Sequence, residues 1–73
     1  MFDIYVTDKD GERLVKRELS RSAAVHHCER MAYTWEHELP RTDMYTFTVY
    51  DERNQLVWFD VYNDKENGGV ATW

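Results

Sequence analysis

The sequence predicts an α+β fold, a two-layer ββαββ arrangement in which two antiparallel hairpins form a sheet and one amphipathic helix packs on one face of it. Three observations predict this fold. Apolar residues recur at helical spacing over residues 20–39, where a strand would scatter them over both faces. Apolar and polar residues alternate, as in strands, over residues 2–19 and 44–63. Turn-forming residues interrupt each of those two segments, as a hairpin requires.

The first hairpin begins with a strand at residues 2–7, where apolar and polar side chains alternate. Asp10 and Gly11 then form the strongest short hairpin signal in the chain. A two-residue turn at these positions would place Val6 opposite Val15, so that apolar residues meet on one face.

The helix is expected to begin at a serine and to end before a proline. Ser20 or Ser22 can cap its first turn, because a hydroxyl oxygen accepts a hydrogen bond from a free backbone N–H there. Pro40 cannot continue a helix and disfavours helical geometry at Leu39 before it. One helix covers only one face of a four-stranded sheet, so the other face is expected to stay open.

Two further strands are expected at residues 44–51 and 55–63. A three-residue loop between them, with Asn54 in the left-handed conformation, pairs Val49 with Val57. This register turns the valines and phenylalanines of both strands towards the helix. The predicted core consists of Phe2, Ile4, Val6, Val15, Leu19, Phe47, Val49, Val57, Phe59 and Val61 from the strands, with Val25, Cys28, Met31, Ala32, Trp35 and Leu39 from the helix.

Length and charge limit the classes of function. The 73 residues allow one small domain, predicted over residues 1–66, with residues 67–73 as a tail that is either flexible or folded back. The net charge is −5 at pH 7, and residues 36–73 carry the whole acidic excess. This imbalance argues against direct binding to a nucleic-acid backbone and favours a protein partner with a basic surface. No segment is apolar over enough residues to predict membrane insertion.

The open sheet face is the first candidate site. The same register exposes an unusually aromatic patch there, which indicates either homodimerisation or docking onto another protein. Ordinary exposure of strand-favouring residues is the plainer explanation. An alternative is a nucleic-acid-binding module that stacks bases on Tyr5, Lys16, Tyr50, Trp58 and Tyr62, although Lys16 is the only basic residue on the predicted face. The predicted contact residues are Tyr5, Tyr50, Leu56, Trp58 and Tyr62.

An acidic end is the second candidate site. Carboxylates in the last turn of the helix oppose the helix dipole, so their presence there suggests a role in binding. The competing explanation is a solubilising surface that Arg41 neutralises in part. The predicted partner-binding residues at this end are Glu36, Asp43, Asp60, Asp64 and Glu66.

We predict no catalytic, cofactor or metal site. His26 and His27 are adjacent and point about 100° apart on a helix, and His37 lies about three turns further on, so no pair can chelate one ion. Cys28 lies within the apolar arc, where a buried thiol is inert. A single cysteine forms no internal disulfide, which favours a reducing compartment and hence the cytoplasm.

These observations together predict a small, acidic, non-enzymatic protein-interaction module. A sharper version is an inhibitor whose carboxylates occupy a basic, nucleic-acid-binding surface on its target. In size, acidity and strand-rich layout with a single helix, the chain resembles small phage-encoded inhibitors, anti-CRISPR proteins among them. The resemblance covers the general plan and implies the cytoplasm of a bacterium or of a phage-infected host.

Overall fold

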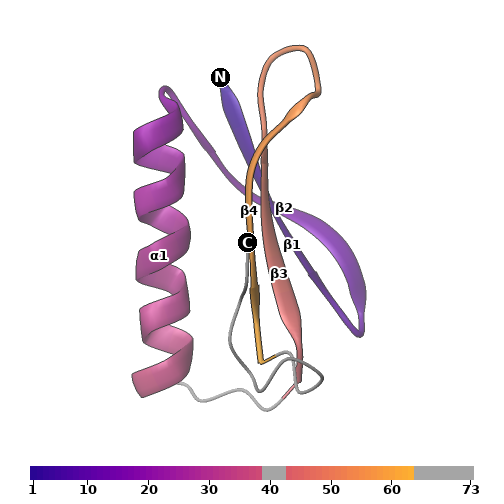
Figure 1. Cartoon of the computed structure of the whole chain (residues 1–73), viewed down its shortest axis with the longest axis vertical. Coiled ribbons are helices and arrows are strands. Elements are labelled where there is room, and N and C mark those ends of the chain that lie inside the picture. Colours follow the sequence, from indigo (N-terminus) through magenta and orange to yellow (C-terminus); the bar gives the residue numbers. More distant parts are fainter. Residues whose placement is uncertain (39–42, 64–73) are drawn as a thin grey trace.

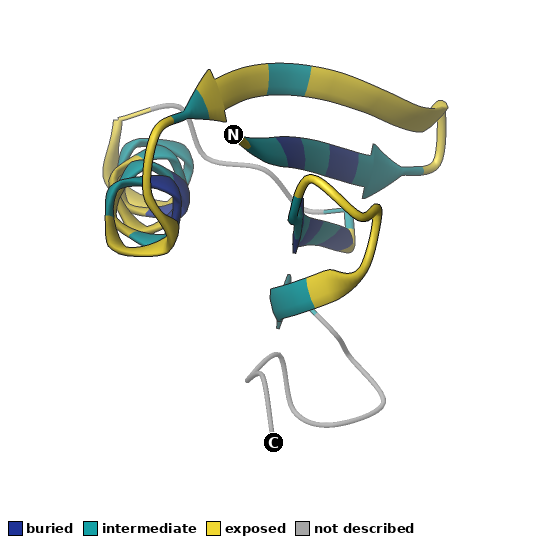
Figure 2. Cartoon of the chain, turned by 90° about the horizontal axis from the view of Figure 1, so that it is seen from above, coloured by how far each residue is buried: buried dark blue, intermediate teal, exposed yellow. Residues whose placement is uncertain are grey.

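A computed structural model describes residues 1–38 and 43–63 of the chain and confirms the predicted fold class (Figure 1). Four antiparallel strands form one sheet in the order β2-β1-β3-β4, and the helix lies along one side of it (Figure 2). In chain order the elements are β1 (Phe2–Asp8), β2 (Gly11–Glu18), α1 (Arg21–His37), β3 (Tyr45–Tyr50) and β4 (Leu56–Tyr62). Within the described residues, no helix is long and apolar enough to cross a membrane.

Several predictions concern positions outside the described residues. They are the helix end at Pro40, the core position of Leu39, the neutralising Arg41, the partner-binding residues Asp64 and Glu66, and the tail at residues 67–73.

The helix begins as the sequence predicts, and Ser20 provides the cap. The Ser20 hydroxyl oxygen accepts a hydrogen bond of 3.1 Å from the backbone N–H of Ala23. The helix ends at His37, and the Glu38 N–H donates to the carbonyl oxygen of Thr34 at 2.8 Å. Both ends therefore satisfy backbone groups that a helix terminus otherwise leaves without partners.

The core lies between the central strands and the helix, where the buried positions of Figure 2 gather. Small side chains on α1 let the helix approach the sheet closely, and the bulk of the core comes from the strands. The Trp35 ring stacks on the Phe47 ring with a centroid separation of 5.4 Å. The fully or almost fully buried residues are Ile4, Val6, Ala24, Cys28, Ala32, Tyr45, Phe47 and Val49.

The first hairpin corrects the predicted register. Its two-residue turn is Lys9 and Asp10, and Gly11 opens β2 with a φ of +109°, where a side chain would be strained. Val6 therefore lies opposite Arg13 instead of Val15. A β-bulge follows at Val15. The Val15 side chain still packs against the core, and the bulge brings Lys16 opposite Ile4.

Leu19 is the clearest error in the predicted core. It lies between β2 and α1 and is 85% exposed. The turn lies one residue earlier than predicted, and together with the bulge at Val15 it brings Glu18, not Leu19, opposite Phe2.

The loop of the second hairpin matches the prediction. Asn54 has a φ of +63°, and the Asp51 N–H donates to the Gln55 carbonyl at 3.0 Å across the three-residue loop. The Asp51 carboxylate accepts hydrogen bonds of 2.9 Å from the backbone N–H groups of Arg53 and Gln55. This network closes the loop and places Tyr50 opposite Leu56, as predicted.

Beyond that pair, the predicted register of β4 is wrong. A β-bulge at Val57 pairs Val49 with Trp58 and Tyr45 with Tyr62, so these two aromatic side chains turn towards the helix and pack against the core. Arg21 at the start of α1 donates from Nε to the carbonyl oxygen of Val57 at 3.3 Å. The bulge reverses the facing of every β4 residue after it.

The reversal buries large aromatic rings in place of smaller side chains. The Tyr62 and Tyr45 rings stack with centroids 5.2 Å apart, and the Tyr62 and Phe47 rings meet edge to face with centroids 5.8 Å apart. Aromatic residues bury more apolar area than valine, and such ring pairs add about 0.5–1.5 kcal/mol beyond that area. Phe59 and Val61, which the sequence analysis placed in the core, lie on the opposite face of the sheet.

Candidate functional site

The sheet face turned away from α1 carries apolar and threonine side chains from all four strands. Among the described residues, no element covers this face (Figure 2). We call it the open sheet face. It consists of Tyr5 and Thr7 from β1, Leu14 from β2, Thr46, Thr48 and Tyr50 from β3, and Leu56, Phe59 and Val61 from β4.

Two tyrosines form a ridge on the open sheet face. The rings of Tyr5 and Tyr50 meet edge to face, with centroids 5.6 Å apart and planes at 84°. On either side of them lie Leu14 and Leu56, with 41% and 49% of their surface exposed. Large apolar side chains left this exposed on one continuous face indicate a contact surface.

Thr48 lies at the centre of this face, between Tyr5 on β1 and Phe59 on β4. Its hydroxyl oxygen is buried beneath its neighbours and has no hydrogen-bond partner among the described residues. A buried hydroxyl without a partner costs about 1–3 kcal/mol. The centre of the open sheet face therefore carries a buried hydroxyl that no described residue hydrogen-bonds.

In the part of the chain that the structure describes, charged groups lie only at the margin of the open sheet face. Arg17 forms an ion pair of 3.1 Å with Asp3 at one corner. At the other corner the Thr7 hydroxyl donates to the Glu12 carboxylate at 3.4 Å. Such a distribution, an apolar centre with a polar rim, is typical of a protein–protein interface.

The predicted aromatic patch is correct in part. Tyr5, Tyr50 and Leu56 share the open sheet face, as predicted, but Trp58 and Tyr62 lie on the helix side because of the bulge at Val57. Sequence reasoning missed Phe59 and Val61 as members of this face. Every β4 position except Asp60 is apolar or aromatic, so alternation alone gave no signal for them.

The predicted base-stacking surface loses three of its residues for the same reason. Trp58 and Tyr62 face the helix, and the bulge at Val15 turns Lys16 to that side as well. The open sheet face then keeps Arg17 as its basic residue, and Asp3 neutralises it. Base stacking works together with a cationic groove for the backbone, which this face lacks among the described residues.

Of the acidic residues predicted at one end, Glu36, Asp43 and Asp60 lie within the described residues. Asp60 lies half-buried on the helix side of β4, opposite the buried Phe47, and accepts a hydrogen bond of 3.0 Å from the N–H of Val61. Asp43 is held by its backbone carbonyl, which accepts from the Asn63 amide at 3.2 Å. Glu36 is exposed on the last turn of α1.

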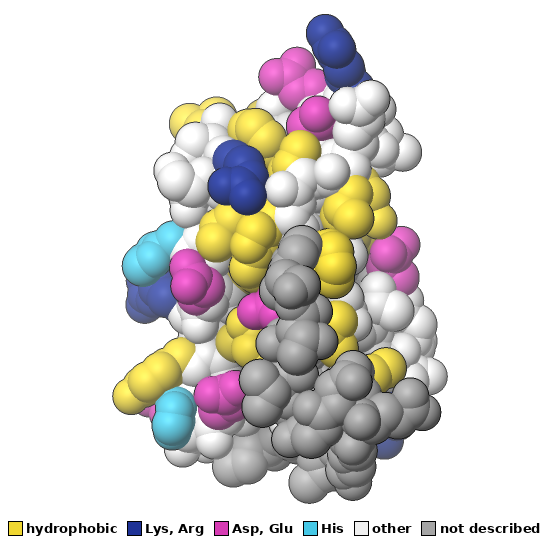
Figure 3. All heavy atoms as spheres, viewed as in Figure 1, with side chains coloured by type: hydrophobic (Ala, Val, Ile, Leu, Met, Phe, Trp, Pro, Cys, Tyr) yellow, Lys and Arg dark blue, Asp and Glu magenta, His cyan; other side chains and the backbone are white. Residues whose placement is uncertain are grey.

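Three carboxylates, two of them from the predicted set, follow the boundary between α1 and β4. Burial raises the pKa of the Tyr62 hydroxyl, and its hydrogen bond to Asp60 and the charge of Glu36 act in the same direction. Glu29 and Asp60 both act on the thiol of Cys28. We call Glu29, Glu36 and Asp60 the acidic flank, and Figure 3 shows acidic side chains on α1 towards β4.

Cys28 is fully buried within the core, as the sequence predicts. Burial, with the Glu29 and Asp60 carboxylates adding to it, raises the pKa of this thiol to about 12. The thiol therefore stays protonated at neutral pH, and a protonated thiol is neither a nucleophile nor a metal ligand.

The histidines lie on the outer side of α1 or at its edge. His37 packs against Tyr33 with ring centroids 4.4 Å apart, and its Nε2 lies 3.9 Å from the Glu36 carboxylate. His26 is exposed on the same helix. Within residues 1–38 and 43–63, no three histidine, cysteine or acidic side chains are arranged to hold a metal ion.

The most distinctive part of the described surface is the open sheet face, with the acidic flank on the other side of the sheet. Comparison with known protein families, with curated protein sequences and with solved structures found no match to this chain.

Proposed function

We propose that this chain is a small non-enzymatic protein-interaction domain that associates with a second copy of itself through the open sheet face. The observation that carries the proposal is the Tyr5–Tyr50 ridge flanked by the exposed Leu14 and Leu56, on a face that no described element covers. Face-to-face packing of two such sheets would remove this apolar surface from water and form a second core layer.

The charge distribution allows a second copy to occupy the open sheet face. Two chains that each carry a net charge of −5 repel one another at most orientations. The open sheet face has an uncharged centre, and its Asp3–Arg17 pair is internally neutral, so it is a surface on which two copies can meet without bringing acids together. A two-fold arrangement also presents each apolar patch to an identical patch.

The available area predicts a weak dimer. Four strands about 4.8 Å apart, each about six residues long at about 3.3 Å per residue, give a flat area of about 400 Å² per copy. Two copies would bury at least about 800 Å² in total, below the roughly 1,200 Å² at which typical stable interfaces begin. The association should therefore depend on protein concentration.

Sedimentation velocity over a wide range of concentration tests the proposal. The wild-type chain should shift from monomer towards dimer as concentration rises. A Leu14→Lys/Leu56→Lys double variant should remain monomeric, because both lysines would meet like charges at the interface. Leu19→Lys is the matched control, since Leu19 is exposed elsewhere and its substitution should leave the dimer intact. Wild-type chain that stays monomeric throughout would refute the proposal.

A second candidate function uses the acidic flank. Glu29, Glu36 and Asp60 line one boundary of the helix, and such a row complements a basic protein surface, in keeping with the predicted inhibitor of a nucleic-acid-binding target. A polyarginine peptide is a suitable calorimetric probe. Glu29→Lys/Glu36→Lys should abolish binding of this peptide. Asp10→Lys/Glu52→Lys changes the net charge by the same amount, and binding as strong as that of the wild type in this control would show that the position of the carboxylates matters. Equal loss in both variants would refute a specific site.

The compartment follows from the same proposal. A cytoplasmic location suits a single buried cysteine that forms no disulfide within the described residues. A partner in the cytoplasm of a bacterium, or of a phage-infected host, would fit the inhibitor version.

A further inference from the structure

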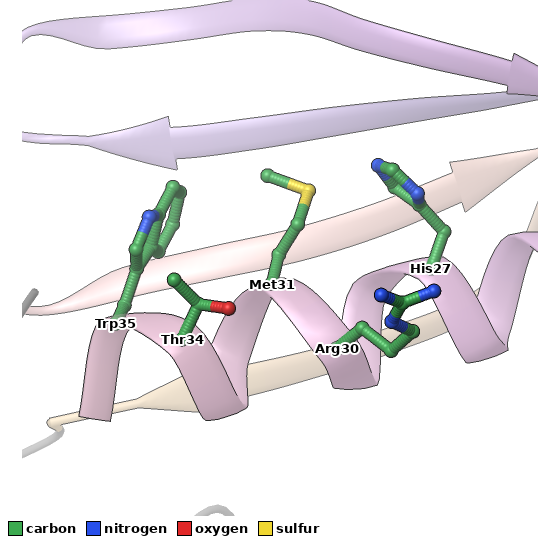
Figure 4. Close-up of a pocket in the computed structure, with 5 residues that line it drawn as sticks. All are labelled: His27, Arg30, Met31, Thr34 and Trp35. Carbon is green, nitrogen blue, oxygen red and sulfur yellow. The ribbon is translucent and has the colours of Figure 1, made fainter. Parts of the chain in front are cut away.

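A groove runs along α1 on the flank opposite the acidic residues. It encloses about 290 Å³ and is lined by His27, Arg30, Met31, Thr34 and Trp35. Figure 4 shows His27, Met31 and Trp35 in one row that points towards the strands, with Arg30 and Thr34 in a second row beside it. These rows arise from the spacing of four residues that places side chains above one another on a helix.

The groove has an apolar floor and a positively charged residue at its rim. Met31 and Trp35 are half-buried and pack against the core, so they form a fixed apolar surface. Arg30 is exposed and makes no ion pair or hydrogen bond within the part of the chain that the structure describes. A guanidinium in this setting is ready to form two parallel hydrogen bonds with a carboxylate.

The charges around the groove differ from those of the rest of the molecule. Lys16 lies opposite Ile4 on the same side of the sheet and likewise has no ion-pair partner among the described residues. The helix acids Glu29 and Glu36 act on the other flank, towards β4. Glu18, opposite Phe2, also lies on this side of the sheet, so Arg30 is the cation that favours an anionic ligand in the groove.

We propose that this groove binds a short peptide segment in which a carboxylate lies next to a large apolar side chain. Arg30 holds the carboxylate, His27 adds a ring N–H donor, and Met31 and Trp35 receive the apolar side chain. A cavity of about 290 Å³ accommodates one or two side chains. A nucleic-acid backbone would need several cations in a row, and among the described lining residues Arg30 alone carries a permanent charge.

Panning a phage-displayed random peptide library against the folded full chain tests this assignment. Peptides selected by the wild type should carry aspartate or glutamate beside leucine, methionine or an aromatic residue. Arg30→Glu should lose this preference and select lysine or arginine instead, because the charge at the rim is reversed. Arg53→Glu, an equal charge change in the loop before β4, should select the same peptides as the wild type.

A second measurement keeps the test independent of the library. A selected peptide titrated into isotope-labelled chain should shift the indole N–H resonance of Trp35, and Arg30→Gln should weaken its binding at least tenfold. Selection of peptides without acidic residues, identical selection by wild type and Arg30→Glu, or no enrichment over Arg30→Gln would each overturn the proposal. The groove lies on the helix side of the sheet, so these outcomes do not depend on dimerisation.

Discussion

Val49 lies opposite Trp58 in the ladder between β3 and β4, whereas the unbroken register would pair Val49 with Val57. This one-residue shift determines which side chains lie on the open sheet face and which face the core. It places Trp58 beneath the helix layer and Phe59 on the open sheet face. Strand side chains alternate with a period of two, so a single extra residue exchanges the two faces of all that follows.

Threonine substitutions on β4 measure this exchange of faces directly. Trp58→Thr should lower the free energy of unfolding by about 3 kcal/mol, because it removes a ring that packs against the core. Phe59→Thr should cost only about 1 kcal/mol, since threonine suits an open strand position. Chemical denaturation of both variants gives the comparison. A larger loss for Phe59→Thr would mean that β4 follows the unbroken register.

Thr48→Val should leave stability unchanged or raise it by up to about 1 kcal/mol. The Thr48 hydroxyl is buried without a hydrogen-bond partner among the described residues, so replacing it with a methyl group removes a desolvation cost. Thermal unfolding of the dilute, monomeric chain is the appropriate measurement. A marked loss of stability would show that the hydroxyl has a hydrogen-bond partner after all. That result would contradict the description of a buried, unpartnered hydroxyl at the centre of the open sheet face.

Ser20→Ala should lower stability by about 1 kcal/mol, because the Ala23 N–H would lose the hydroxyl that caps the helix. Ser22→Ala, two residues later, is the matched control. Its hydroxyl contacts that of Ser20 at 3.4 Å but bonds no helix N–H, so its loss should cost at most a few tenths of a kcal/mol. Urea unfolding of the two variants distinguishes them, and equal costs would contradict the assignment of the cap.

Stability should fall as pH rises from about 9 towards 12. The pKa of Cys28 is raised from its ordinary value of 9.0 to about 12, so above pH 9 the unfolded chain releases the thiol proton while the folded chain retains it. Release of a proton on unfolding favours the unfolded state as pH increases. Cys28→Ala should flatten this part of the pH profile, whatever its effect at pH 7. An unchanged slope would show that the thiol reaches water in the folded chain.

Much of the fold could be predicted from the sequence, because several signals were local and strong. The helical spacing of apolar residues and the Ser20 cap located α1, and Asn54 located the loop before β4. In β3, threonines alternate with Tyr45, Phe47 and Val49, so its facing was unambiguous and correct.

The two bulges could not be predicted, because no local pattern marked them. Residues in β4 are apolar on both faces, so either register buries hydrophobic side chains, and only the packing of the whole core decides between them. The aromatic rings of Trp58 and Tyr62 fill the core better than the smaller side chains on the other face. In the first hairpin, the Asp-Gly pair predicted a turn at Asp10 and Gly11, one residue later than the observed turn at Lys9 and Asp10.

The open sheet face was predicted only in part, because the register of β4 was predicted without its bulge. Tyr5, Tyr50 and Leu56 were predicted correctly because β1 and β3 alternate cleanly and Leu56 precedes the bulge. The groove at Arg30 could not be derived from the sequence: its five lining residues lie on α1, and whether they border a depression depends on tertiary distances to the rest of the chain. Tertiary distances of this kind are not encoded in any short pattern.

The central claim is that two copies meet through the open sheet face, with Phe59 and Val61 at the contact. Intermolecular nuclear Overhauser effects in a concentrated mixture of isotope-labelled and unlabelled chains test it most directly. We predict effects between the Val61 methyl groups of one copy and the Tyr5 or Tyr50 ring of the other. Intermolecular effects confined to α1, or none at concentrations where sedimentation shows a dimer, would contradict the claim.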